Sequence, residues 1–291
     1  MSEAHAGYYL PEPSHWPIVG SVGLFATFGG FAMLLNGSGV GSFVMGIGVS
    51  IVIFMMFGWF GAVIGESEGG IYNRQVDVSF RWGMAWFIFT EVMFFGAFFG
   101  ALFYARVYSV PWLAGEGSGF STHELLWPKF QAAWPLLQLP DPTHFTVAKE
   151  AMAPVWIPAI NTAILLSSGA TVTWAHWGLK MGNRRQLITG LILTVALGFT
   201  FLGFQAHEYW HGYTAMDLKL SSGIYGTTFF MLTGFHGAHV TIGAIMLTVI
   251  LIRSIKGHFT PTHHFAFEAV AWYWHFVDVV WICLFMFVYV L

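Results

Sequence analysis

Long runs of apolar residues constrain this chain more than any other feature of its sequence. A helix needs about 20 residues to cross about 30 Å of hydrocarbon, and the chain has seven runs of roughly that size or longer. A helix also satisfies its own backbone hydrogen bonds, which lipid cannot do. The sequence therefore predicts an all-α membrane protein with seven transmembrane helices, at about residues 16–35, 42–64, 78–107, 155–179, 187–207, 223–255 and 265–291.

Composition and charge exclude several other classes of protein. Only 9% of the 291 residues are charged, against about 25% in soluble domains, and 56% are hydrophobic. The net charge of −3 and the lack of a Lys/Arg run exclude a nucleic-acid partner. The single cysteine, Cys283, allows neither a disulfide framework nor a thiolate metal site. The first residues lack the basic and apolar regions of a cleavable signal, so we expect the first span to direct insertion.

The distribution of lysine and arginine predicts the orientation in the membrane. The loops after the second, fourth and sixth runs hold seven such residues, and the opposite side holds four. By the positive-inside rule, the N-terminus then lies inside and the C-terminus outside, with residues 1–15 as a cytoplasmic segment. Residues 108–154, rich in proline and tryptophan, are expected to form an ordered external loop with short interfacial helices.

Glu91 is an acidic residue near the middle of the third apolar run, in WFIFTEVMFFGAFF. Its carboxyl must be protonated, pair with a group on another helix, or meet water. No basic residue of the same run lies within a helical turn, so we expect a protonated acid. Two interpretations remain open: a protonated Glu91 that is hydrogen-bonded to a neighbouring helix, or a role in lipid or proton handling.

A structural polar stripe is predicted in the last two runs. In FEAVAWYWHFVDVVW, the offsets of seven and three place Glu268, His275 and Asp278 on one helical face. In TGFHGAHVTIG, His236 and His239 are also three residues apart. Glycines beside them allow a neighbouring helix to approach closely.

Two metal-centred alternatives compete with this structural interpretation. His207, Glu208 and His211 in QAHEYWHG have the H-E-x-x-H spacing of zinc metalloproteases. A catalytic zinc site needs a third protein ligand and an open position, and no downstream residue provides that ligand. His176 and the three histidines named above could hold haem or copper, but their spacing favours no coordination geometry. The sequence therefore predicts no metal ligand and no catalytic residue in this chain.

Five stretches together resemble subunit III of the haem-copper cytochrome c oxidases, of the aa3 type. They are FRWGMAWFIFTEVMFF, NTAILLSSGATVTWAH, GIYGTTFF, TGFHGAHVTIG and FEAVAWYWHFVDVVW. Seven spans fit the cytochrome c oxidase branch better than the quinol oxidase branch, whose similar third subunit typically has five. Quinol oxidase subunit III and a polytopic membrane metalloprotease remain the alternatives.

The resemblance implies an accessory subunit without a redox centre. Helices within 16–66 would form a two-helix bundle, and those within 67–291 a five-helix bundle, separated by a V-shaped lipid cleft. Haem and copper would belong to partner subunits I and II, which reduce oxygen with electrons from cytochrome c. This chain would pack against subunit I, bind phospholipids and support proton uptake, and QAHEYWHG would be an accidental match.

The resemblance also implies positions that contact lipid. Glu91 matches the family's buried glutamate in the third helix, and the second helix and the basic stretch after the sixth span contribute the others. Gly65 stands where related chains often have arginine, so one headgroup contact is expected to be missing. We place the chain in a bacterial cytoplasmic membrane. The predicted lipid-binding residues are Trp59, Glu66, Glu91, Arg253, Lys256, His258 and His263.

Overall fold

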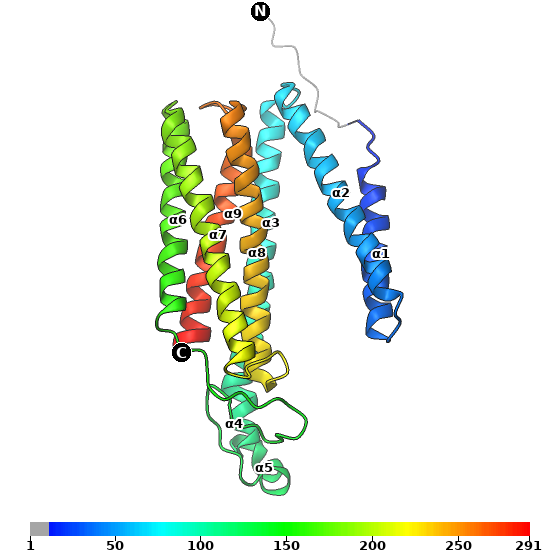
Figure 1. Ribbon diagram of the computed structural model, residues 1–291, viewed down its shortest axis with the longest axis vertical. Helices are drawn as coiled ribbons and strands as arrows, with labels where there is room; N and C mark the ends of the chain where they lie inside the picture. The colour runs from blue at the N-terminus through cyan, green and yellow to red at the C-terminus, as the bar shows by residue number, and fades with distance from the viewer. Residues whose placement is uncertain (1–11) are drawn as a thin grey trace, which may run out of the picture. The chain divides into compact units, whose positions relative to one another are not determined.

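The computed structural model describes residues 12–291, and every long element in them is a helix (Figure 1). Most of the expected cytoplasmic segment, residues 1–11, lies outside the described residues. The predicted all-α fold with seven long helices is confirmed. These helices are α1 (Trp16–Leu35), α2 (Gly41–Glu68), α3 (Arg74–Tyr104), α6 (Ile157–Lys180), α7 (Arg184–Thr214), α8 (Gly223–Lys256) and α9 (Phe265–Leu284).

Six of the seven long helices in the described part of the chain are both long and apolar enough to cross a membrane. The remaining one, α6, has 24 residues, which is long enough, but it is less apolar than the others. Its sequence, IPAINTAILLSSGATVTWAHWGLK, contains several serines and threonines. These hydroxyls form hydrogen bonds to α7 and α9, so the polarity of α6 serves contacts between helices.

Several helices extend beyond the predicted spans. α7 continues through the QAHEYWHG sequence to Thr214, although the apolar run was expected to end near His207. α3 is followed without a break by a π-helical turn, Ala105–Ser109, and by α4 (Val110–Leu113). The predicted external loop, 108–154, therefore begins as a helix. It also contains a 3₁₀ turn (Gly117–Gly119) and α5 (Phe120–Leu126), in agreement with the short helices expected there.

The chain divides into two compact units, the first ending at Trp82 and the second comprising Gly83–Leu291. In the first unit, α1 and α2 pack closely because glycines lie at their contact. A Cβ atom at Gly30 would overlap the backbone of Met45, and one at Gly48 would overlap that of Thr27. Small residues at such contacts allow helices to approach in lipid, where the hydrophobic effect does not drive them together.

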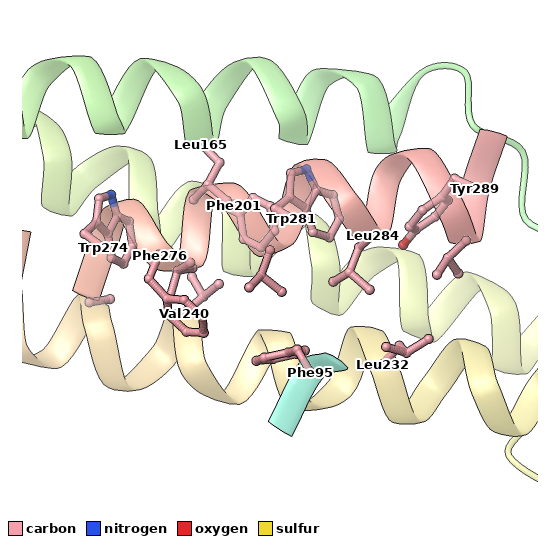
Figure 2. Packing of buried hydrophobic residues seen from close by; sticks show 14 of the residues in the cluster. Phe95, Leu165, Phe201, Leu232, Val240, Trp274, Phe276, Trp281, Leu284 and Tyr289 are labelled. Carbon is pink, nitrogen blue, oxygen red and sulfur yellow. The ribbon is translucent and has the colours of Figure 1, made fainter. Parts of the chain in front are cut away.

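The second unit has its buried core around α9. Trp274 and Trp281 of α9 are 0% exposed, and Figure 2 shows Trp281 beside Phe201 of α7. Gly198 of α7 leaves room for the Trp274 ring, because a Cβ there would lie 2.9 Å from a ring carbon. Buried side chains of α3 and α8, including Phe95, Leu232 and Val240, complete this core.

Two local signals define the helix ends at one end of this unit. Asn183 caps the start of α7, where its side-chain oxygen accepts a hydrogen bond of 3.2 Å from the backbone N–H of Gln186. Gly257 ends α8 in the left-handed conformation, with φ of 83°, which glycine adopts without steric cost. Lys180, Arg184 and Lys256 are therefore held at the connections of neighbouring helices.

Candidate functional site

Polar side chains join α6 to α9 along a line of hydrogen bonds. The indole N–H of Trp274 donates to Ser168 Oγ at 2.8 Å, and that of Trp281 donates to Thr162 Oγ1 at 2.9 Å. Ser168 is 0% exposed. Each bond pairs a buried indole N–H that would otherwise lose its hydrogen bond to water. The hydroxyl groups of α6 thus fix its position against α9.

The predicted polar stripe of α9 divides into separate contacts. His275 Nε2 lies 3.2 Å from Thr173 Oγ1 on α6, and His275 Nδ1 lies 3.5 Å from Asp278 Oδ2. Gly169 makes this possible, because a Cβ there would overlap the Asp278 carboxylate. Glu268, the third member of the stripe, forms its contacts elsewhere, with His264 and His176.

His236 and His239 on α8 face different partners. The buried His236 has Nε2 at 3.2 Å from the backbone carbonyl of Val277 on α9. His239 has Nε2 at 2.9 Å from Glu91 Oε2 on α3. The structure thus brings both histidines into contacts between helices, but it does not join them to each other or to the stripe of α9.

The hydrogen bonds around His239 show which protons the Glu91–His239 contact holds. His239 Nδ1 lies 2.6 Å from the Phe235 carbonyl oxygen, which can only accept, so Nδ1 carries a proton. One further proton must then lie between Glu91 and His239 Nε2, on either the carboxyl or the ring. The sequence shows no basic residue near Glu91 on its own helix. The structure adds a basic partner from another helix, His239 of α8.

The QAHEYWHG sequence does not form the arrangement of a zinc protease. His207 and His211 are exposed, whereas Glu208 is 1% exposed and its Oε1 accepts a hydrogen bond of 2.7 Å from the Tyr289 hydroxyl. The carboxylate thus points into the bundle, away from the exposed faces of the two imidazoles. This geometry argues against Glu208 acting as a general base for a metal-bound water at that position.

The described residues do contain one group of three side chains with metal-ligand spacing, formed by His176, His264 and Glu268. The sequence prediction missed it, since it did not consider His264. The available signal was the i,i+4 spacing of His264 and Glu268 at the start of the last span. His176, one turn before the end of α6, comes from more than 80 positions earlier in the chain.

The predicted lipid-binding residues of the first unit lie on α2. Trp59 is 44% exposed. Glu66 is partly buried, and its Oε2 accepts a hydrogen bond of 2.6 Å from the Tyr72 hydroxyl. Glu66 therefore holds the connection between α2 and α3, in addition to any role at a lipid headgroup.

The basic stretch at the end of α8 is divided between buried and exposed positions. Arg253 is 8% exposed, and its guanidinium lies 4.7 Å from the centre of the Phe259 ring. Lys256 and His263 are exposed, and His258 is partly buried. Lys256 and His263 are thus the members of this predicted group whose side chains are open to a headgroup.

Ion pairs outside the spans fasten the connections at the other end of the unit. Lys149 Nζ lies 2.7 Å from Asp217 Oδ2 in the connection between α7 and α8. The hydrogen bond from Lys149 lowers the pKa of Asp217 below its usual value. Hydrogen bonds from Thr143 lower the pKa of Asp141 to about 2. The side chains of Asp141 and Asp217 are 33% and 35% exposed, so solvent weakens these interactions.

Comparison with known proteins identifies the family. The sequence model of cytochrome c oxidase subunit III matches residues 5–291. The chain belongs to the cytochrome c oxidase subunit III family. It is 41% identical to cytochrome c oxidase subunit 3 of Marchantia polymorpha over 292 residues, which cover 99% of this chain and 97% of the relative. The same protein of Coturnix japonica and that of Arabidopsis thaliana are each 39% identical, with the same coverage of both chains.

The resemblance seen in the sequence is thereby confirmed. The chain is a multi-pass membrane protein and a subunit of an oxidase complex, so other subunits of that complex are its partners. Subunit III relatives occur in plants and birds as well, so family membership alone does not assign a bacterial membrane.

Proposed function

We propose that this chain is an accessory subunit of a proton-pumping cytochrome c oxidase and contains no redox centre. Electrons from cytochrome c would reduce oxygen to water at haem and copper in subunits I and II, and this chain would stabilise subunit I. The observation that best supports this proposal is that ionisable groups within the bundle pair with one another across helices. Glu91 pairs with His239 and Glu208 with Tyr289, which is an arrangement that fixes packing.

The names of the relatives favour a subunit of a cytochrome c oxidase over a subunit of a quinol oxidase. Each of the three relatives described above is a cytochrome c oxidase subunit 3 of which this chain covers 97%. The alternative of a membrane metalloprotease receives no support, because the Glu208 side chain is buried and bonded to Tyr289.

Binding of structural phospholipids is the second part of the proposal. The first unit exposes large apolar side chains along both of its complete helices, including Phe25, Phe28, Phe57 and Trp59. At the end of α8, the exposed Lys256 can donate charge-assisted hydrogen bonds to a phosphate. We assign headgroup contacts to Lys256, His258 and His263, with Arg253 supporting them from a buried position over Phe259.

The proposed orientation is N-terminus inside and C-terminus outside, in a bacterial cytoplasmic membrane. Its support is that Lys180, Arg184, Arg185, Arg253 and Lys256 belong to the ends of α6, α7 and α8 at the same side of the unit. Such clusters face the cytoplasm by the positive-inside rule. On this side the chain would help to supply protons to subunit I.

Comparison of the purified oxidase with and without this chain tests the accessory role. We expect the complex without it to keep its haem spectrum and copper content, since the redox groups would belong to other subunits. It should lose bound phospholipid and take up protons more slowly during turnover. Loss of a stoichiometric haem or copper on removal of the chain would overturn the proposal.

A single substitution tests the lipid assignment within the intact complex. Lys256→Ala should reduce the lipid phosphorus retained per haem while the haem spectrum stays unchanged. Lys219→Ala is the matched control, because Lys219 precedes α8 at its opposite end and pairs with Asp217 at 3.5 Å. Equal lipid content in the parent complex and the Lys256 variant would contradict the assignment.

A further inference from the structure

We propose that His176, His264 and Glu268 form a binding site for a divalent transition-metal ion, with Zn²⁺ as the best fit. His176 lies one turn before the end of α6, His264 is the residue that precedes α9, and Glu268 lies in the first turn of α9. Their ligand atoms all lie within 4.8 Å of one another. No part of this proposal depends on the role of the chain in the oxidase.

The separations of the ligand atoms suit a tetrahedral ion. Ligands about 2.1 Å from a tetrahedral zinc ion lie about 3.4 Å from each other. Glu268 Oε1 lies 3.1 Å from His264 Nε2 and 3.7 Å from His176 Nε2, on either side of that value. The third separation, between the two imidazoles, is within 4.8 Å, so rotation of the side chains is needed to bring all three atoms to bonding distance.

Both imidazoles present an Nε2 atom that makes no hydrogen bond. The Nε2 atoms of His176 and His264 are buried and have no hydrogen-bond partner among the described residues. Buried polar atoms are nearly always satisfied by protein, water or an ion. Two such atoms near one carboxylate, one from α6 and one from the residue that precedes α9, point to a ligand between them.

The second nitrogen of His264 fixes the protonation that a metal ligand requires. Its Nδ1 lies 3.0 Å from the Thr260 carbonyl oxygen, which can only accept, so Nδ1 carries the proton. In the neutral ring, Nε2 then has a lone pair directed toward the Glu268 carboxylate. Histidines that bind metals commonly donate their other N–H to a carbonyl in this way.

The chemistry of the three ligands favours zinc over harder ions. Two imidazoles and one carboxylate form the ligand set of several zinc sites, which leave a fourth position for water or another ligand. Calcium and magnesium prefer sites made of oxygen atoms. The exposed fractions of the His176, Glu268 and His264 side chains are 19%, 12% and 8%, so the site lies close enough to the surface for an ion to enter. A bound ion would hold the ends of α6 and α9 together.

The competing arrangement has no metal. In it, a second proton on His264 makes an imidazolium ion that pairs with Glu268. That pair would account for the 3.1 Å separation of His264 Nε2 and Glu268 Oε1, but it would leave His176 Nε2 without a partner. The two arrangements differ in their affinity for zinc.

Zinc binding by the full-length chain in detergent distinguishes them. The chain is treated with a chelator, equilibrated with Zn²⁺ alone at neutral pH, and assayed for bound metal. We expect one zinc per chain, with an X-ray absorption spectrum showing two imidazoles and oxygen at about 2.0–2.2 Å. Since loss of an outer-shell contact costs about 10–100-fold in affinity, loss of the ligand in His264→Gln should cost about 100-fold or more.

Neighbouring histidines provide matched controls. His263→Gln changes the adjacent exposed residue, and His207→Gln changes the QAHEYWHG sequence; both variants should bind zinc as the parent chain does. His264→Cys should restore binding, with sulfur at about 2.3 Å from the metal. Because this variant replaces the same side chain, its recovery separates lost ligation from misfolding, and circular dichroism without metal checks the helices.

Three results would overturn the site. The first is a parent chain that binds no zinc after the chelator is removed. The second is equal zinc affinity in the parent chain and in His264→Gln. The third is an absorption spectrum without imidazole ligands, or zinc that is lost in His207→Gln and retained in His264→Gln.

Discussion

Replacement of Ser168 by alanine tests the hydrogen bonds that join α6 to α9. Ser168 Oγ accepts a hydrogen bond of 2.8 Å from the indole N–H of Trp274 and donates one of 2.6 Å to the Leu165 carbonyl. Both Ser168 and Trp274 are 0% exposed. The change removes one oxygen atom and leaves the buried indole N–H without its acceptor.

The expected cost follows from burial of that donor. A buried donor left without a partner costs about 1–3 kcal/mol. Double-mutant cycles within membranes give smaller couplings, about 0.6 kcal/mol on average and about 1.7 kcal/mol at most. Since both groups here are completely buried, Ser168→Ala should lower the free energy of unfolding by about 1–2 kcal/mol.

Unfolding of the purified chain in mixed detergent micelles measures this cost, with far-UV circular dichroism reporting the loss of helix as denaturing detergent is added. Ser167→Ala is the matched control, because Ser167 is exposed and its hydroxyl donates to the Ala163 carbonyl of its own helix, at 2.7 Å. That variant should stay within about 0.5 kcal/mol of the parent chain.

A double-mutant cycle with Trp274→Phe then isolates the bond itself. If the reasoning holds, Ser168→Ala costs less in a chain that already carries Trp274→Phe than in the parent chain, because no indole N–H remains to be left unpaired. Equal costs for Ser168→Ala and Ser167→Ala, or strictly additive effects of Ser168→Ala and Trp274→Phe, would refute the proposed coupling of α6 to α9.

Two further predictions concern other pairs. In the same assay, Glu91→Leu should lower the free energy of unfolding by about 1 kcal/mol more than Glu91→Gln does, because the glutamine amide can still donate to His239 Nε2. Equal decreases in the two variants would contradict the pairing. At neutral pH, Asp217→Asn should destabilise the connection held by Lys149. Because the folded pKa of Asp217 is lowered, the stabilising effect is present above the unfolded value of 3.8 and is lost as the pH falls through the folded pKa. Proteolysis of the two chains over this pH range measures the effect, and a difference that persisted in acid below both pKa values would count against it.

The class of fold can be predicted from the sequence, because the signals for it are local. Apolar runs long enough to span a membrane, with glycine and asparagine at helix ends such as Gly257 and Asn183, predict helices independently of their neighbours. The 3.6-residue period likewise places Glu268, His275 and Asp278 on one face of α9. Family membership followed from the residues themselves, over residues 5–291.

The partners of each polar side chain were decided only by the tertiary structure. Glu91 and His239 are 148 positions apart, and no helical period relates residues on different helices. The stripe of α9 separates because seven residues advance a helix by about 10 Å, so Glu268 reaches His264 and His176 while His275 reaches Thr173.

The same distinction explains the two groups of histidines. In QAHEYWHG, the spacing suggested a metal site, but packing of α7 turns Glu208 inward to Tyr289 and leaves His207 exposed. His176 and His264 have no motif between them, yet the contact of α6 with α9 brings their nitrogens to a common carboxylate. Ligand geometry depends on distances between helices, and those distances arise only when the bundle has packed.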